Sequence, residues 1–147
     1  MLEEAIELRK SLDEDARRHI HLVCLPMDDA EENAVIVNAL QRNASVVVQK
    51  SIAEGFGLTV AEAMWKGRPL VATKVGGIQD QIVDGETGVL LDDPRDLDAY
   101  GDAVRSLLED PERAKQMGEA AQQRVRNQFL GARSLIDYLG LIARLLA

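Results

Sequence analysis

Apolar residues follow two different spacings along this chain. Short apolar runs rich in β-branched residues are typical of buried strands, whereas longer segments carry apolar residues at helical spacing. The short runs predict strands over residues 21–26, 45–49, 69–73 and 89–91. The longer segments predict helices over residues 3–12, 34–42, 59–66, 79–83, 96–108, 111–128 and 132–146.

This alternation of strands and helices predicts an α/β fold. We expect a Rossmann-like parallel sheet with helices on both faces. Sheets of this kind bind ligands at the carboxyl ends of their strands. The loops expected to carry function are therefore residues 26–29, 51–58 and 74–78. With 147 residues, the chain is long enough for one core, so residues 1–147 are expected to form a single domain.

Composition narrows the choice of partners. The net charge of −8 disfavours binding to nucleic acid. No apolar run reaches the roughly 20 residues that span a bilayer, and the acidic start does not resemble a signal peptide. We therefore expect a cytoplasmic protein without a membrane partner. The single cysteine, Cys24, lies in an apolar run, which predicts a small buried residue and excludes an intrachain disulfide.

The second of these loops contains the most informative residues. It follows a predicted strand and leads into a predicted helix. Gly55 and Gly57 let the backbone approach a ligand closely. The amides of Leu58, Thr59 and Val60 fall in the first helical turn, where N–H groups lack intrahelical partners. Such a helix start binds anions, and a diphosphate would fit there.

Two carboxylates flank this helix start. Glu54 precedes the turn and Glu62 lies one turn into the helix. Carboxylates accept hydrogen bonds from sugar hydroxyls, so the segment is suited to a nucleotide sugar. A purely structural alternative stays open at this point. Thr59 and Glu62 also have the spacing of a capping box, and the glycines fit a tight strand-to-helix turn.

The segment from Glu54 to Glu62 matches a family motif. It has the spacing of a Glu-x7-Glu motif, encloses Gly-Phe-Gly-Leu and is followed by Ala-Met. Residues 67–71, 75–78 and 82–88 match the same family. From about residue 19 onward, the chain resembles the family-4 retaining glycosyltransferases, which have the two-domain GT-B fold. The resemblance implies an incomplete C-terminal half of a GT-B fold that binds the sugar donor.

This resemblance assigns roles to the motif. It implies a site for a nucleoside-diphosphate glucose, such as ADP-glucose or UDP-glucose. The first carboxylate would hold glucose hydroxyls, the amides would meet the glucose and the diphosphate, and the second carboxylate would hold the ribose diol. Residues 25–26 would lie near the base. The implied donor-binding residues are Glu54, Gly55, Phe56, Gly57, Leu58, Thr59 and Glu62.

The resemblance also bears on the reaction. Residues 37–44, 48–52 and 63–67 resemble the trehalose-forming branch of the family, which joins donor glucose to free glucose. Retaining GT-B enzymes are thought to let the leaving phosphate help deprotonate the acceptor. No catalytic protein residue is therefore expected. No metal is expected either, because no Asp/His cluster has ligand spacing, and no cofactor is implied. Trp65 and Lys66 are expected to serve packing and the surface.

Parts of the family pattern have no match in this chain. In the family, the C-terminal domain opens with two further strands, which bring an arginine and a lysine to the diphosphate. The N-terminal domain supplies the acceptor site and a histidine, which His19 and His21 do not match. We therefore expect this chain alone to be inactive. Without those strands, residues 21–26 and 45–49 must pair directly, leave a gap or borrow a partner.

Association with a second copy is a further expectation. Unpaired strand edges favour association. Residues 132–146 also form a broad apolar face, and in the family the terminal helix packs across the domain junction. We therefore predict a homo-oligomer or a rearranged core.

Two other functions remain open. One is a nucleotide-sugar-binding module without chemistry. The other is a flavodoxin-like interaction or receiver domain, which Asp28 and Asp29 favour weakly. A receiver needs an aspartate after the 45–49 strand, where Lys50 and Ser51 stand instead.

Overall fold

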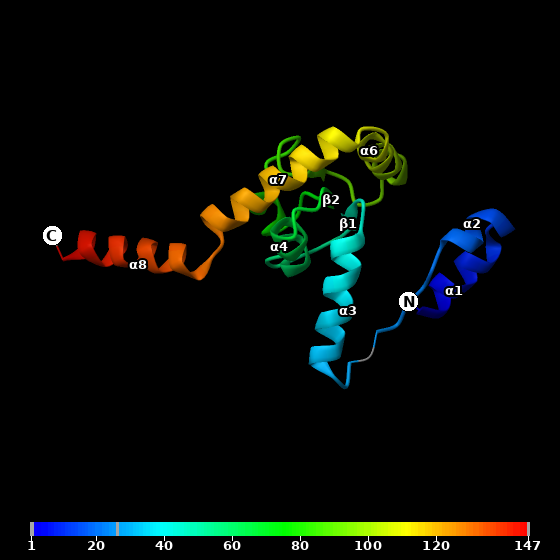
Figure 1. Ribbon diagram of the computed structural model, residues 1–147, viewed down its shortest axis with the longest axis horizontal. Helices are drawn as coiled ribbons and strands as arrows, with labels where there is room; N and C mark the ends of the chain where they lie inside the picture. Colours follow the sequence, from blue (N-terminus) through cyan, green and yellow to red (C-terminus); the bar gives the residue numbers. More distant parts are fainter. Residues whose placement is uncertain (1, 26, 147) are drawn as a thin grey trace. The chain divides into compact units, whose positions relative to one another are not determined.

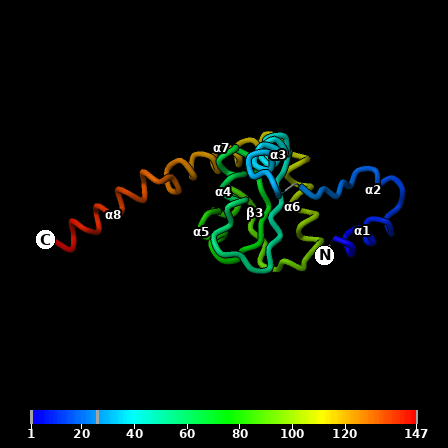
Figure 2. Tube along the Cα trace, turned by 90° about the horizontal axis from the view of Figure 1, so that it is seen from below, coloured from blue at the N-terminus to red at the C-terminus, as the bar shows by residue number. Residues whose placement is uncertain are grey.

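Residues 2–25 and 27–146 are described in the computed structural model. The chain divides into two units, Met1–Asn38 and Ala39–Ala147. Figures 1 and 2 trace the elements from α1 to α8. The assignment of residues 1–147 to a single domain stays a prediction.

Short helices make up the ordered part of the first unit. They are α1 (Leu2–Ser11), α2 (Glu14–His19) and the larger part of α3 (Ala30–Asn43). The helix α2 was not predicted. The side chain of Asp13 caps it by accepting a hydrogen bond from the Ala16 amide at 2.8 Å. The Arg9 guanidinium donates to the carbonyls of Arg17 and Ile20, at 2.8 and 2.6 Å, and so links α1 to α2 and to the residue that follows it.

The predicted strand over residues 21–26 is wrong for the described residues. Residues 20–25 are neither helix nor strand, and Pro26 lies outside the described residues. The Leu22 and Val23 side chains are 42% and 66% exposed. A strand requires a neighbour that satisfies its backbone groups, and the described chain provides none here. Cys24 is likewise exposed, which contradicts the prediction of a buried thiol.

The second unit contains the parallel sheet that the pattern predicted. Its strands are β1 (Val47–Gln49), β2 (Leu70–Thr73) and β3 (Val89–Leu91), in the order β1-β2-β3. Both pairings are parallel, with Val48 opposite Val71 and Ala72 opposite Leu90. The α/β prediction is therefore confirmed. In the described chain, β2 is the one strand that pairs with β1.

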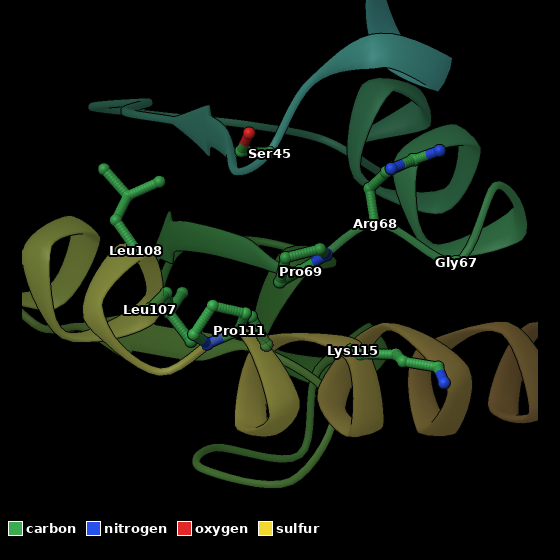
Figure 3. Close-up of a pocket in the computed structure, with 9 residues that line it drawn as sticks. Ser45, Gly67, Arg68, Pro69, Leu107, Leu108, Pro111 and Lys115 are labelled. Carbon is green, nitrogen blue, oxygen red and sulfur yellow. The ribbon is translucent and has the colours of Figure 1, made fainter.

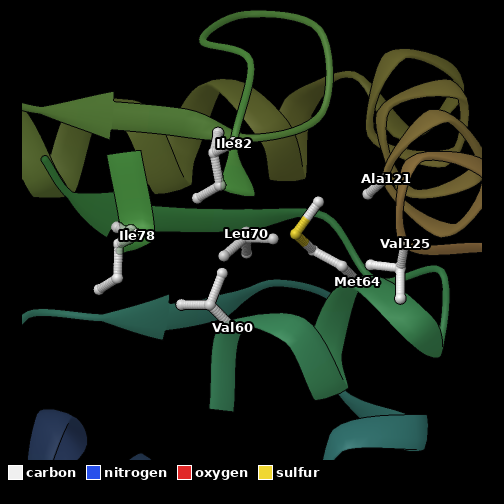
Figure 4. Packing of buried hydrophobic residues seen from close by; sticks show 8 residues of the cluster. Val60, Met64, Leu70, Ile78, Ile82, Ala121 and Val125 are labelled. Atoms are coloured by element: carbon white, nitrogen blue, oxygen red, sulfur yellow. The ribbon is translucent and has the colours of Figure 1, made fainter. Parts of the chain in front are cut away.

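One face of the sheet is covered by an apolar cluster. Successive strand residues point to opposite faces, and Leu70 and Ala72 of β2 point to this one. The covering helices are α4 (Leu58–Trp65), α5 (Ile78–Gln81) and the second half of α7 (Pro111–Gln128). Figure 4 shows the packing of the buried side chains Val60, Met64, Leu70, Ala72, Ile78, Ile82, Ala121 and Val125.

The opposite face is covered by α6 (Leu97–Glu109) and the first half of α7. Its buried residues are Val71, Tyr100, Leu107, Ala114 and Met117. The hydroxyls of Thr73 and Tyr100, both buried, share a hydrogen bond on this face. Helices thus cover both faces, as predicted, and α7 runs beside both α4 and α6 (Figure 1).

The last helix, α8 (Gly131–Leu145), has no buried residue. None of the helices in the described part of the chain combines the length and the apolar character needed to cross a membrane.

Candidate functional site

Two loops emerge at the carboxyl edge of the sheet. The glycine loop, residues 50–57, connects β1 to α4, and the support loop, residues 74–77, connects β2 to α5. Because β1 and β2 are parallel, the two loops lie at the same edge. The predicted position at the carboxyl ends of the strands is therefore confirmed for two of the three loops. The third, residues 26–29, follows no strand, and Pro26 is outside the described residues.

Gly57 sets the start of α4. It precedes the helix with φ of 86° and ψ of 56°, a left-handed conformation that favours glycine. A Cβ at this position would also lie 2.8 Å from Cγ1 of Ile78. The carbonyl of Gly57 accepts hydrogen bonds from the amides of Val60 and Ala61, at 3.0 and 3.2 Å. The amide of Val60 is therefore paired, in contrast to the prediction.

The two preceding amides remain open. Within the described chain, the structure gives no acceptor for the N–H groups of Leu58 and Thr59, the first two residues of α4. Both residues are exposed. The dipole of a helix places partial positive charge at this end. The arrangement is therefore suited to an anionic group.

Glu62 does not form the capping box that Thr59 and Glu62 suggested. The helix begins before Thr59, at Leu58, and the residue that precedes it, Gly57, has no side chain to cap it. The Glu62 carboxylate instead accepts a hydrogen bond from Nε2 of Gln41 at 3.3 Å. The Oε1 of Gln41 accepts from Lys66, so Glu62 is held on the exposed side of α4 by a fixed amide.

Glu54 lies in the glycine loop and is half-buried. Its Oε1 accepts a hydrogen bond from the Gly55 amide at 3.0 Å. That amide is one of those expected to face a ligand, and here it is occupied by the preceding carboxylate. Apart from its chain neighbours, no heavy atom of residues 2–25 and 27–146 lies within 4 Å of a Cβ built at Gly55, so the space beside the loop is open.

The support loop touches the glycine loop backbone to backbone. The amide of Gly77 donates to the carbonyl of Gly55 at 2.7 Å. Gly76 has φ of 50°, and a Cβ built there would lie 1.8 Å from the carbonyl oxygen of Glu54. Sequence reasoning placed these two glycines in a loop expected to carry function, but it did not predict that this loop packs on the glycine loop.

Further supporting residues were missed altogether. The buried side chain of Gln81 donates to the carbonyl of Phe56. The ring of Phe56 packs edge-to-face on Phe129, with 6.5 Å between ring centroids. Arg124 lies over the Phe129 ring, 5.8 Å from its centroid. No sequence motif marks Gln81, Arg124 or Phe129, because their contacts join segments that are distant along the chain.

The support loop carries one charged side chain. Lys74, in the support loop, forms an ion pair with Asp92 at 3.6 Å. Residues 2–25 and 27–146 contain no group of three or more His, Cys, Asp or Glu side chains that could hold a metal ion. Trp65 and Lys66 lie at the other end of α4. There the Arg126 guanidinium carbon lies 5.6 Å from the centroid of the Trp65 ring, and the Lys66 ammonium donates a hydrogen bond to Oε1 of Gln41. These contacts accord with roles in packing and at the surface.

A cavity of about 290 Å³ lies at the opposite, amino-terminal edge of the sheet (Figure 3). Pro69, which precedes β2, and Pro111, which begins α7, both line it. Ligands of parallel sheets bind at the carboxyl ends of the strands. The glycine loop is therefore the stronger candidate site.

Comparison with known proteins identifies the class. The family profile described as "Glycosyl transferases group 1" matches residues 31–124, which is most of the chain. That range includes the glycine loop, the support loop and α4. The chain belongs to the group 1 glycosyltransferases.

Individual relatives refine this picture. The chain is 50% identical to trehalose synthase of Pyrococcus horikoshii over 106 residues, which cover 72% of this chain and 25% of that protein. The chain thus spans about a quarter of the length of this relative. A sucrose-phosphate synthase from Thermosynechococcus elongatus has a similar structure, with a TM-score of 0.64 and 37% identity over 80% of this chain and 28% of that one. HepE of Anabaena, solved in complex with UDP-glucose, matches with a TM-score of 0.58 and 26% identity, over 61% of this chain and 25% of that one.

Proposed function

We propose that this chain carries the donor-binding part of a retaining glucosyltransferase that uses a nucleoside-diphosphate glucose. The observation that carries the proposal is the start of α4. Two open amides, those of Leu58 and Thr59, follow the left-handed Gly57, and along the chain they stand between two carboxylates, Glu54 and Glu62. Open amides and the helix dipole favour a diphosphate, whereas carboxylates favour hydroxyls.

In this proposal the donor lies along the glycine loop. The diphosphate accepts hydrogen bonds from the amides of Leu58 and Thr59, and the Glu62 carboxylate accepts hydrogen bonds from both hydroxyls of the ribose diol. The glucose lies beside Gly55 and Phe56, where the open space leaves room for it. Glu54 exchanges its contact with the Gly55 amide for glucose hydroxyls.

The chemistry places negative charge on the leaving diphosphate as the bond to glucose breaks. Fixed amides aimed at that charge stabilise it without reorganisation. No residue of this chain acts as a nucleophile in the proposal, and the leaving phosphate assists deprotonation of the acceptor. The similarity to trehalose synthase supports free glucose as the acceptor and trehalose as the product.

Turnover is expected to need more than this chain. Because the chain spans about a quarter of the trehalose synthase it matches, the acceptor site and the cations for the diphosphate are proposed to come from elsewhere. The cytoplasmic location expected from the sequence stays a prediction.

Calorimetric titration with ADP-glucose and with UDP-glucose tests the proposal. The chain is expected to bind at least one of them, and Glu62→Ala is expected to weaken that binding by about tenfold or more, the effect of losing hydrogen bonds to a charged acceptor. Glu62→Gln keeps an acceptor for Gln41 and removes the charge, so it separates donor binding from local packing.

The matched control is Glu119→Ala, which removes an exposed carboxylate from α7 and is expected to leave affinity unchanged. Absence of binding at millimolar concentrations of both donors would refute a donor site formed by this chain. Equal donor affinity in the unmodified chain and in both Glu62 variants would show that Glu62 does not contact the donor.

We also propose that the chain self-associates through α8. Its exposed apolar side chains support this proposal, among them Leu135, Ile136, Leu139 and Ile142, each more than half exposed. Contiguous exposed apolar surface is typical of interaction sites. Sedimentation velocity is expected to show a dimer or larger species that Leu139→Glu dissociates and that Ser134→Glu, on the same helix, does not. A monomer at all concentrations would overturn this proposal.

A further inference from the structure

Gln81 is an unusual residue for its position. It ends α5, and its side chain is 1% exposed. Its Nε2 donates to the carbonyl of Phe56 in the glycine loop. Its Oε1 is buried and has no partner in the described structure. A buried acceptor without a hydrogen bond opposes folding, so stability alone would favour an apolar side chain here.

The hydrogen bond from Gln81 reaches the residue directly before Gly57, which starts α4. Two consecutive carbonyls, those of Gly55 and Phe56, are held from the support loop and α5, the first by the Gly77 amide and the second by Gln81. The carbonyl of Phe56 and the amide of Gly57 belong to one planar peptide. Fixing that carbonyl therefore fixes the approach to Gly57, which starts α4 and aims the open amides.

The backbone of Gln81 is itself held by hydrogen bonds from Arg124. The Arg124 guanidinium donates to the backbone carbonyls of Gln81 and Asp80, at 2.6 and 2.8 Å. Arg124 also lies over the ring of Phe129, which packs against the ring of Phe56. The contacts close a circuit from Phe56 through Gln81, Arg124 and Phe129 back to Phe56. Both the backbone and the ring of Phe56 are thus held by one connected group.

We propose that Gln81 is a positioning residue that orients the glycine loop for the nucleotide-sugar donor by fixing the Phe56 carbonyl. The inference rests on the proposed function for its ligand, but the loop geometry can be tested without one. Gln81 does not touch the donor. It acts through Phe56, and its unpaired Oε1 marks a side chain that serves the loop at the expense of stability.

Gln81→Met tests the proposal, because methionine has a similar shape and lacks the amide. The free chain is examined by hydrogen–deuterium exchange of the peptide over residues 54–60 and by urea unfolding. We expect an unfolding midpoint no lower than that of the unmodified chain. We also expect exchange about tenfold faster at the Val60 amide of this peptide, because a loosened loop opens its hydrogen bond to the Gly57 carbonyl. The affinity for ADP-glucose or UDP-glucose is expected to fall by about the same factor.

The control is Gln122→Met, which removes a comparable amide-to-carbonyl hydrogen bond, of 2.7 Å to Trp65, at the far end of α4. It is expected to leave both the exchange of residues 54–60 and donor affinity unchanged. Unchanged exchange in Gln81→Met would overturn the proposal, as would loss of stability with faster exchange throughout the second unit.

A second variant covers the case in which Gln81→Met does not fold. In Gln81→Glu, a carboxylate oxygen faces the Phe56 carbonyl at high pH. Burial at this position favours the protonated acid at pH 5, whose O–H can donate to that carbonyl. The exchange of residues 54–60 is expected to be fast at pH 8 and restored at pH 5 to that of the unmodified chain, once each is corrected for intrinsic exchange. The absence of this pH dependence would overturn the proposal. If the unmodified chain binds neither donor, the proposed function fails, and the exchange measurements still decide the role of Gln81.

Discussion

Replacing Gly76 with alanine is expected to destabilise the second unit and to abolish donor binding. Gly76 has φ of 50°, and an added Cβ would lie 1.8 Å from the carbonyl oxygen of Glu54. The left-handed strain and the forced separation of the two loops together are expected to lower the free energy of unfolding by about 3 kcal/mol or more. Urea unfolding followed by circular dichroism measures this, and calorimetry measures donor affinity.

The control for this variant is Gly85→Ala. Gly85 also has a positive φ, of 76°, but nothing lies within 4 Å of a Cβ built there. Only the conformational strain of about 1–2 kcal/mol is expected, with donor affinity retained. Equal losses of stability in Gly76→Ala and Gly85→Ala would show that the support loop and the glycine loop do not pack as described.

Gly118→Ala is the second variant with a large expected effect. Gly118 lies in the middle of α7, where an added Cβ would be 2.1 Å from the carbonyl oxygen of Gly67. Alanine favours a helix over glycine by roughly 0.5–1 kcal/mol, but this gain is smaller than the cost of moving α7 away from the turn after α4. We expect the free energy of unfolding to fall by about 3 kcal/mol, measured by urea unfolding.

The matched control is Gly101→Ala in α6, where nothing lies within 4 Å of the added Cβ. This variant is expected to be more stable than the unmodified chain by about 0.5–1 kcal/mol. A stabilising effect of Gly118→Ala similar to that of Gly101→Ala would contradict the close crossing of α7 over Gly67.

The hydrophobic pattern predicted the second unit well. The strand over residues 89–91 and the helix over residues 111–128 have the predicted bounds, and β1 and β2 lie within their predicted ranges. The same reasoning failed at residues 21–25. An apolar run has the same pattern whether or not a neighbouring strand is present, so periodicity alone cannot show that the pairing partner is missing.

Local sequence signals were less reliable at helix starts. The pattern predicted a helix that ends at residue 12, yet Asp13 directly after it caps a further helix, α2. Thr59 and Glu62 had the spacing of a capping box, but the left-handed Gly57 starts α4 two residues earlier than a Thr59 cap allows. The choice between such alternatives depends on loop geometry, which single residues do not determine.

The sequence predicted the residues of the candidate site itself but not the residues that support them. The motif residues from Glu54 to Glu62 lie at the carboxyl edge of the sheet, where the pattern placed them. The residues that hold the motif in place, such as Gln81 and Arg124, were not found. Their hydrogen bonds connect positions 25 and 43 residues apart, and no periodicity links such positions.

The path of α7 has a consequence for how this unit loses its structure. Its first half supplies Ala114 and Met117 to one face of the sheet, and its second half supplies Ala121 and Val125 to the other. Neither face can open by itself, because the helix that would have to lift away from one cluster also closes the other. The sheet with its helices therefore lacks a separable subdomain, and its unfolding is expected to be a single cooperative transition.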